Sequence, residues 1–338
     1  MEYFAGIDLH SNNSYIAIID NDNKRVFKKK VRNDLQNIVH VLEPHRKQIK
    51  GIVVESTYNW YWLVDGLMEK SYKVHLANPS AIKQYEGLKH SDDVTDAFHL
   101  ANLLRLGILP EGYIYPKEER PVRDLLRKRL QLVQQRTALI LSFENLLARN
   151  LGRRLKVDEI KKLTEVDVED IFQQEHLVQS GKASIATINF LGVRITQIEK
   201  TLHKSAKLKS EHKKLMTVPG IWKILALTIM YETGPIKRFS KVGNYTSYCR
   251  CVGSKRISNG KQKGKGNRKN GNKHLSRAYV EAANHARWNY EYVDRYYQRK
   301  MARTNNVVAI KAIAHKLARA CYCIIRDQKA FDKGKLFA

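Results

Sequence analysis

The chain has 338 residues, a hydrophobic content of 43% and a formal net charge of +28. That length allows two or three domains with a sizeable core. The most apolar stretch, Val307 to Ile325, is interrupted by basic side chains, so it predicts no membrane span. The first residues open directly into a strand-like run without a signal-peptide profile. We therefore expect a cytoplasmic protein.

The charge is graded along the chain. Residues 1–106 carry 14 basic and 13 acidic side chains, residues 107–215 carry 21 and 14, and residues 216–338 carry 26 and 6. Because polyanions attract such clusters of Lys and Arg, the gradient predicts a nearly neutral N-terminal domain and a C-terminal domain that binds nucleic acid. A generic basic surface is the alternative interpretation.

The N-terminal third has the pattern of an α/β domain of about 105 residues. Turn-type sequences separate three short strands, and strand and helix then alternate. The expected strands are 3–9, 14–20, 24–31, 51–55 and 72–77. The expected helices are one capped by Asn33 or Asp34 and running to about His45, one over 58–70, one opening near Pro79, and one over about 92–106. This order matches the ribonuclease H-like fold.

Helical periodicity dominates the rest of the chain. Residues 118–151 and 183–213 predict two long amphipathic helices, which form a helical hairpin or coiled coil of the kind that serves dimerisation. Helices expected at 221–231, 273–288 and 306–325 make up a third, mainly helical part. The predicted domains are thus 1–108, 109–214 and 215–338.

Four carboxylates occupy places where this fold would bring them together. Asp8 closes the first strand, and Glu55 closes the fourth, which neighbours the first in a ribonuclease H-like sheet. Asp93 and Asp96 lie three residues apart at the start of a helix and so share a face. Such a cluster repels itself unless cations neutralise it, and two hard divalent ions bridging a phosphate are the natural solution.

Each acid also has a purely structural interpretation. Asp8 and Glu55 could simply end their strands, and Asp92, Asp93 and Asp96 could cap a helix and stabilise its dipole. Asp92 and Asp96 also lie one turn apart, which leaves the register of the helical pair open. The joint occurrence of acids at every required place favours the metal site.

The stretch from Arg250 to Arg277 is strongly basic. It contains ten Lys or Arg residues, five glycines and no acid, so cations and flexible backbone are available to hold a phosphate chain. We expect an irregular segment that orders on DNA. Its candidate nucleic-acid contacts are Arg250, Lys255, Arg256, Lys261, Lys263, Lys265, Arg268, Lys269, Lys273 and Arg277.

Ser258 lies inside this basic segment, where its hydroxyl could attack a phosphodiester if it were activated. A hydrogen-bonding role, which Ser254 and Ser276 share, is the plainer interpretation. The run Thr217 to Ile221 resembles a helix-hairpin-helix phosphate-binding turn, although Trp222 stands where the second glycine is usual. A structural turn is an equal alternative.

The four cysteines form two Cys-x-Cys pairs, Cys249 with Cys251 and Cys321 with Cys323. This spacing is too short for common structural zinc sites. We expect free, buried thiols.

These motifs together resemble the DEDD-type transposases of the insertion-sequence one-ten family, regarded as bridge-RNA-guided serine recombinases. The resemblance covers almost the whole chain. It is carried by ordered motifs: Gly6-Ile7-Asp8, Val54-Glu55-Ser56-Thr57, Asp93-Val94-Thr95-Asp96-Ala97, Val218-Pro219-Gly220-Ile221, Arg238-Phe239, Ser258-Asn259-Gly260-Lys261, Lys269-Asn270-Gly271-Asn272 and His315-Lys316-Leu317-Ala318.

The resemblance implies a RuvC-like catalytic domain in which Asp8, Glu55, Asp93 and Asp96 bind Mg²⁺, two ions per site, and position the scissile phosphate. Ser258 would be the nucleophile and form a covalent phosphoserine link. The partners implied are donor and target DNA, an element-encoded noncoding guide RNA and further copies of the chain, as dimer or tetramer, in a prokaryotic cytoplasm at the nucleoid. Sequence choice would then rest on base pairing.

Three other functions fit parts of the pattern. An actin-like or sugar-kinase-like ATPase shares the first strand and turn, but the sequence lacks the second phosphate loop and the adenosine motif. A Holliday-junction resolvase uses the same carboxylates with water and needs no basic C-terminal domain with a serine. A non-enzymatic RNA-binding protein does not need all four acids.

Overall fold

The computed structural model describes residues 1–82, 93–206, 210–253, 256–264, 270–332 and 336. The chain forms two compact units, Met1–Lys117 and Glu118–Ala338. The first unit extends past the predicted boundary at residue 108. The predicted division of the remainder at residue 215 stays a prediction.

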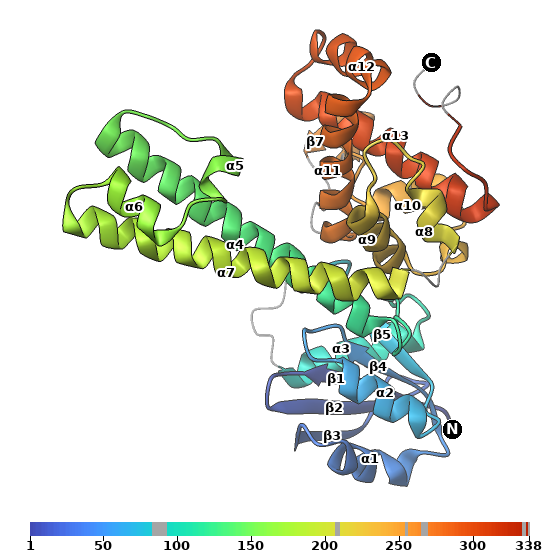
Figure 1. The fold of residues 1–338 in the computed structure, drawn as a ribbon. Helices are drawn as coiled ribbons and strands as arrows, with labels where there is room; N and C mark the ends of the chain where they lie inside the picture. Colours follow the sequence, from blue (N-terminus) through green and yellow to red (C-terminus); the bar gives the residue numbers. More distant parts are fainter. Residues whose placement is uncertain (83–92, 207–209, 254–255, 265–269, 333–335, 337–338) are drawn as a thin grey trace. The chain divides into compact units, whose positions relative to one another are not determined.

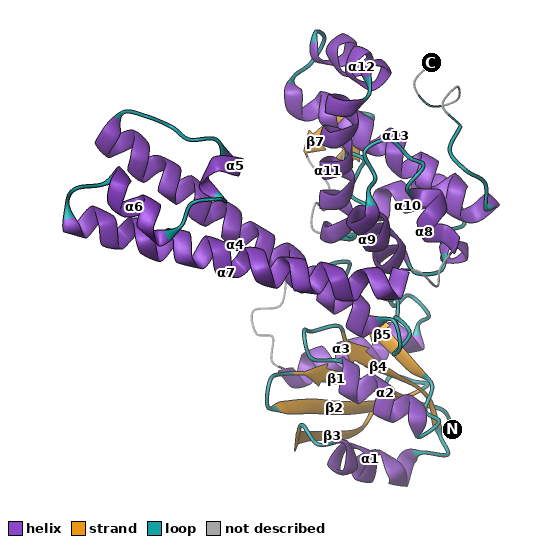
Figure 2. Cartoon of the chain, in the orientation of Figure 1, coloured by secondary structure: helices purple, strands orange, loops and turns teal. Residues whose placement is uncertain are grey.

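The first unit is built on a mixed five-stranded sheet with the order β3-β2-β1-β4-β5 (Figure 2). The first three strands are antiparallel, and β1, β4 and β5 are parallel. The predicted strands and the predicted pairing of the first with the fourth are confirmed. The strands are β1 (Tyr3–Leu9), β2 (Asn13–Asp20), β3 (Arg25–Arg32), β4 (Ile49–Glu55) and β5 (Val74–Ala77).

Helices cover both faces of this sheet, which explains the apolar runs in its central strands. On one face Ile16 and Ile18 pack with α1 (Leu35–Leu42) and α2 (Tyr61–Glu69). On the other, Ala17 and Ile19 pack with α3 (Asp93–Arg105).

The local signals at the helix starts have mixed outcomes. Of the two candidate caps, Asn33 and Asp34, it is Asp34 that caps α1, accepting a hydrogen bond from the Asn37 N–H, and a short 3₁₀ helix, η1 (Glu43–His45), follows. The helix expected at Pro79 is wrong for residues 79–82, of which 79–81 form a turn; residues 83–92 lie outside the described residues. Proline fits this turn because its ring restricts φ and it lacks an N–H.

A long helical hairpin opens the second unit, as predicted. Helices α4 (Arg120–Leu151) and α7 (Glu175–Ala206) lie side by side, and two short helices, α5 (Val157–Ile160) and α6 (Glu165–Ile171), pack at one end (Figure 1). Phe143 and Phe172 make an edge-to-face contact in the hydrophobic core that these helices share.

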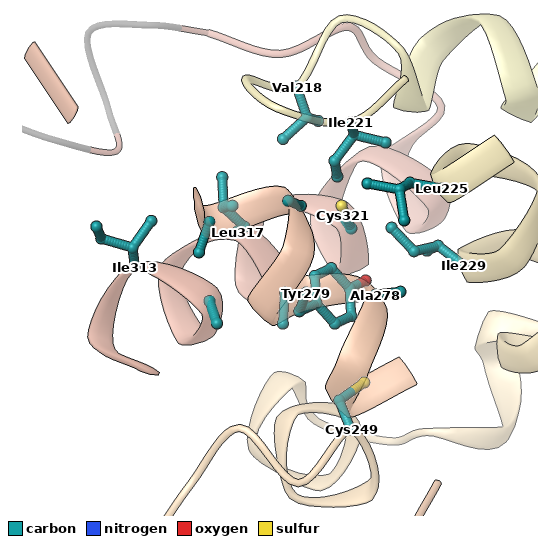
Figure 3. Close-up of a cluster of buried hydrophobic side chains, with 14 of the residues drawn as sticks. Val218, Ile221, Leu225, Ile229, Cys249, Ala278, Tyr279, Ile313, Leu317 and Cys321 are labelled. Carbon is teal, nitrogen blue, oxygen red and sulfur yellow. The ribbon is translucent and has the colours of Figure 1, made fainter. Parts of the chain in front are cut away.

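The C-terminal helices share a separate core around Tyr279 and Cys321 (Figure 3). The alanines of α11 (Lys273–Asn289) let neighbouring helices approach closely, and a Cβ built on Gly220 would lie 2.1 Å from the Ala282 carbonyl oxygen. The elements are α8 (Ser210–Leu215), α9 (Lys223–Thr233), η2 (Ile236–Arg238), α10 (Val242–Tyr248), α11 (Lys273–Asn289), α12 (Glu291–Met301) and α13 (Asn306–Asp327).

The basic segment is more regular than predicted. Residues 256–264 form a β-hairpin of β6 (Arg256–Ser258) and β7 (Lys261–Gly264). Asn259 and Gly260 both have positive φ, 50° and 69°, as a type I′ turn requires. The Asn-Gly pair was therefore a hairpin signal, and the expectation of an irregular segment is wrong for these residues.

All four cysteines are free. Cys249 and Cys321 are buried as expected, whereas Cys323 is exposed because residues two apart on a helix face different directions. Within the described residues, no helix combines the length and the apolar character needed to cross a bilayer.

Candidate metal centre

Asp8 and Glu55 meet at the carboxyl ends of two parallel strands. Ile7 of β1 pairs with Val54 of β4, so the next residues, Asp8 and Glu55, stand side by side. Their carboxyl groups are hydrogen bonded to each other, and Asp8 is only 4% exposed. The sheet thus brings Asp8 and Glu55 together, as predicted.

Gly6 determines how close α3 comes to these carboxyl groups. A Cβ built on Gly6 would lie 2.0 Å from the Ala97 carbonyl oxygen and 2.9 Å from the Ala101 nitrogen. Only a glycine in β1 allows the helix backbone this close approach. The first turn of α3, which carries Asp93 and Asp96, is thereby held against the end of β1.

The aspartate pair of α3 faces the strand carboxylates. The charge of Asp96 acts on Glu55, and a carboxylate oxygen of Asp93 lies 3.5 Å from the Nε2 of His10, which also contacts Asp8. All four predicted carboxylates are thus brought to one place. The competing residue, Asp92, lies outside the described residues.

The pKa of Glu55 reflects both its burial and the acids around it. Burial raises the pKa of this carboxyl group, and the hydrogen bond and charge of Asp8 and the charge of Asp96 raise it further, to about 7. The nearby His10 lowers it in part. Protonation of Glu55 reduces its repulsion with Asp8 and Asp96, and a bound cation would do the same.

His10 is a member of this cluster that was not predicted. Its Nε2 lies 3.0 Å from Asp8 Oδ2 and 3.5 Å from Asp93 Oδ1. Asp8, His10 and Asp93 each offer a ligand atom, all within 4.8 Å of one another. The signal was present in the sequence, because a residue two positions beyond Asp8 in an extended chain shares its face.

The backbone of His10 is fixed from two directions. Its carbonyl oxygen accepts hydrogen bonds from the side-chain amides of Asn33 and Asn59, at 2.8 and 3.0 Å. Ser14 and Thr57 in turn donate to the oxygens of these amides. The imidazole is therefore presented to the carboxylates by a rigid loop.

This donor set fits a divalent cation. Carboxylate oxygens are the hard ligands that Mg²⁺ and Mn²⁺ accept, and an imidazole nitrogen is better suited to Mn²⁺ and other transition metals. Burial is the largest cause of the raised pKa of Glu55, and Asp8 and Asp96 add to it by repulsion that such an ion would offset.

The predicted nucleic-acid contacts whose side chains the structure describes fall into two groups: exposed residues and a residue with a structural role. Lys261, Lys263, Lys273 and Arg277 are exposed. Arg250 instead holds the base of the hairpin segment, with its Nε donating to the carbonyls of Asn270 and Gly271, at 3.1 Å each. Lys255, Lys265, Arg268 and Lys269, and the side chain of Arg256, lie outside the described residues.

Ser258 ends β6 directly before the Asn-Gly turn, and it is exposed. The two ends of the segment that carries it are tied together, since the Asn272 N–H donates to the Tyr248 carbonyl at 2.6 Å. A serine at a hairpin tip is accessible to a large substrate such as a nucleic acid strand.

Comparisons with known proteins match both units. Residues 5–150 match a DEDD-type IS110 transposase family, and residues 212–298 match a family described as Transposase IS116/IS110/IS902 family. The chain belongs to the IS110 family of transposases. The transposase for insertion sequence element IS1328 of Yersinia enterocolitica is 22% identical over 342 residues, covering 97% of this chain and 98% of that protein.

Membership in the IS110 family establishes the general activity. The protein is an insertion-sequence transposase, an enzyme whose substrate is DNA. It also implies dependence on a divalent metal ion, which agrees with the donor set at the end of β1.

Proposed function

We propose that this IS110-family transposase cuts and rejoins DNA by covalent strand exchange, with a RuvC-like metal site formed by Asp8, Glu55, Asp93 and Asp96. The observation that supports the proposal is the convergence of all four acids, together with the pKa of Glu55 at about 7. Clustered carboxylates of this kind carry a large cost unless they bind cations.

Asp8 and Glu55 would hold the metal from the sheet, and Asp93 and Asp96 from the helix. When bound there, two Mg²⁺ ions supply Lewis-acid stabilisation of the developing charge on phosphate. His10 keeps the carboxyl groups of Asp8 and Asp93 in place through its Nε2. Gly6 keeps α3 close enough for both halves of the set to act together.

Ser258 is the proposed nucleophile. Its hydroxyl loses a proton as Oγ forms a bond to phosphorus, while the bond from phosphorus to the leaving deoxyribose oxygen breaks and that oxygen takes up a proton. Attack by the hydroxyl of another strand then reverses the step and returns Ser258 to its free form. The link conserves the energy of the phosphodiester, so joining needs no nucleotide cofactor.

The basic C-terminal part and the helical hairpin would bind the nucleic acids. We propose that an element-encoded guide RNA pairs with donor and target DNA, and that the chain acts as a homo-oligomer in a prokaryotic cytoplasm, at the nucleoid. The charge of residues 216–338 supports a phosphate-binding role, with 26 basic and 6 acidic side chains.

Replacing Ser258 by alanine tests the covalent step. Ser258→Ala should abolish strand joining and the trapped protein–DNA adduct, while Ser254→Ala, in the same basic segment, should retain both. An adduct that survives in Ser258→Ala refutes the nucleophile assignment. Metal-dependent cleavage without any adduct in the wild type would favour resolvase-like hydrolysis by water instead.

Asp8→Asn tests the metal site separately. It should remove metal-dependent cleavage while leaving RNA binding intact, because the RNA contacts are assigned to other parts of the chain. Binding of DNA and RNA should weaken steeply with salt, as counterion release requires. Full cleavage by Asp8→Asn, or affinity that does not change with salt, would contradict the proposal.

A further inference from the structure

Two exposed tryptophans form one aromatic surface on the second unit. Trp222 is 57% exposed and Trp288 is 69% exposed. His285 joins them: the Trp222 ring stacks on it with centroids 5.1 Å apart and planes 18° apart, and Trp288 meets it edge-on at 6.1 Å. Single exposed aromatic residues are common, but a joined pair of this size marks an interaction site.

Local structure holds this surface in place. Trp222 is the extended residue directly before α9, and it lies two positions after Gly220, whose backbone packs on α11. Because His285 and Trp288 belong to α11, the turn before α9 and the surface of α11 are fixed together. The rings are therefore preorganised rather than free to collapse.

An open hollow of about 640 Å³ lies beside the rings, lined by Trp222 and His285. This size is within the range of about 300–1,000 Å³ typical of small-ligand pockets. Lys223 and Glu281 line it as well, and Lys223 is exposed. The hollow thus offers a flat apolar face, a cation and a hydrogen-bond acceptor.

We propose that Trp222 and its neighbours hold an unpaired base of the DNA substrate by stacking. A base has the flat π-face that an exposed indole stacks on, and Lys223 is placed for the adjoining phosphate. Glu281 accepts a hydrogen bond from an exocyclic amine, which adenine and cytosine have and thymine lacks.

The occupant is assigned to DNA because the transposase acts on DNA, and strand exchange must unpair bases beside the cut. The C-terminal part also has the charge that such a strand requires. The inference rests on the DNA substrate of the transposase and on the strand exchange of the proposed function, but it needs neither the metal site nor the nucleophilic serine.

Tryptophan fluorescence measures this contact directly. The chain has four tryptophans, and the other two, Trp60 and Trp62, are buried or half-buried. An oligo(dA) strand of about 15 nucleotides, a length typical of single-strand sites, should quench the emission of the full chain in EDTA. Trp222→Ala should weaken that binding about tenfold, as loss of one stacked base predicts. Trp222→Phe should retain most of the affinity.

Tyr58→Ala is the control, since Tyr58 is an aromatic residue that is 81% exposed and lies in the first unit. This variant should bind oligo(dA) like the wild type. Duplex DNA of the same sequence should bind all variants equally, because its bases are already stacked.

Several outcomes would overturn the inference. Unchanged oligo(dA) affinity in Trp222→Ala would do so, as would an equal loss for duplex DNA. A loss confined to oligo(rA) would assign the surface to RNA. A change of oligomeric mass in Trp222→Ala would assign it to a second copy of the chain.

Discussion

Gly6 of β1 lies directly against the carbonyl group of Ala97 in α3, where a Cβ would come within 2.0 Å of the oxygen. The contact joins the strand that carries Asp8 to the helix that carries Asp93 and Asp96. A packing requirement thus positions half of the proposed metal ligands.

We expect Gly6→Ala to push α3 away from the sheet. Forced overpacking of this kind costs about 1–3 kcal/mol of unfolding free energy, and divalent-ion affinity should fall as well. Gly112→Ala is the control, because its Cβ would meet only ordinary contacts at 3.5 Å. Urea unfolding and calorimetric Mn²⁺ titration measure the two effects. Unchanged Mn²⁺ affinity in Gly6→Ala would show that the contact does not position the ligands.

Glu55 should make the metal-free protein sensitive to pH. Its pKa in the folded chain is about 7, above the ordinary 4.5, so the folded chain retains a proton that the unfolded chain releases between these values. The stability from this group is present below about pH 4.5 and is lost as the pH rises through about 7.

Glu55→Gln should therefore stabilise the protein in EDTA by about 1–2 kcal/mol near pH 8, after allowance for solvent screening. It should have little effect near pH 5. Urea unfolding at both pH values measures the difference, and saturating Mg²⁺ should remove the advantage of the variant. Equal stabilisation at both pH values would contradict the pKa assignment.

His10 should strengthen metal binding by holding Asp8 and Asp93. Loss of a group that orients metal ligands typically lowers affinity about 10–100-fold, and we expect His10→Ala to weaken Mn²⁺ binding by about tenfold. His40→Ala, an exposed histidine on α1, is the control. Mn²⁺ titration followed by calorimetry or electron paramagnetic resonance provides the measurement. If His10→Ala binds Mn²⁺ like the wild type, the imidazole has no part in the site.

Glu232 is a buried acid that holds the second unit together. It accepts hydrogen bonds from Arg123 and Arg127 of α4 and from the Asn272 side chain, which caps α11. Burial alone would raise its pKa, but the bond from Arg127 and the charges of both arginines outweigh burial and lower the pKa to about 2. The stability from this ion pair is present above about pH 4.5 and is lost as the pH falls toward 2.

Glu232→Gln should cost about 3–5 kcal/mol of unfolding free energy at neutral pH, because it leaves Arg123 buried without its counter-charge. Glu199→Gln, which removes the partner of the more exposed Arg129, should cost less than about 1 kcal/mol. Chemical denaturation of the two variants gives the comparison. Similar losses of unfolding free energy in Glu232→Gln and Glu199→Gln would mean that burial does not determine how much an ion pair contributes to stability.

Local patterns along the chain were enough to place the sheet and two of its acids. Alternating and continuous apolar runs set the five strands, and a strand order of this type places Asp8 beside Glu55. The spacing of Asp93 and Asp96 determined that they share a helix face. The long hairpin also followed from local periodicity. These features depend on neighbours in the chain or on a single pairing rule.

The residues that complete the sites could be identified only from the three-dimensional packing of the chain. The role of Gly6 depends on a helix some ninety residues away, and Glu232 meets arginines more than a hundred residues earlier. The stacking of Trp222 on His285 likewise joins two helices. Long-range packing of this kind leaves no periodic trace in the sequence, because a side chain's environment is set by whatever the fold brings against it.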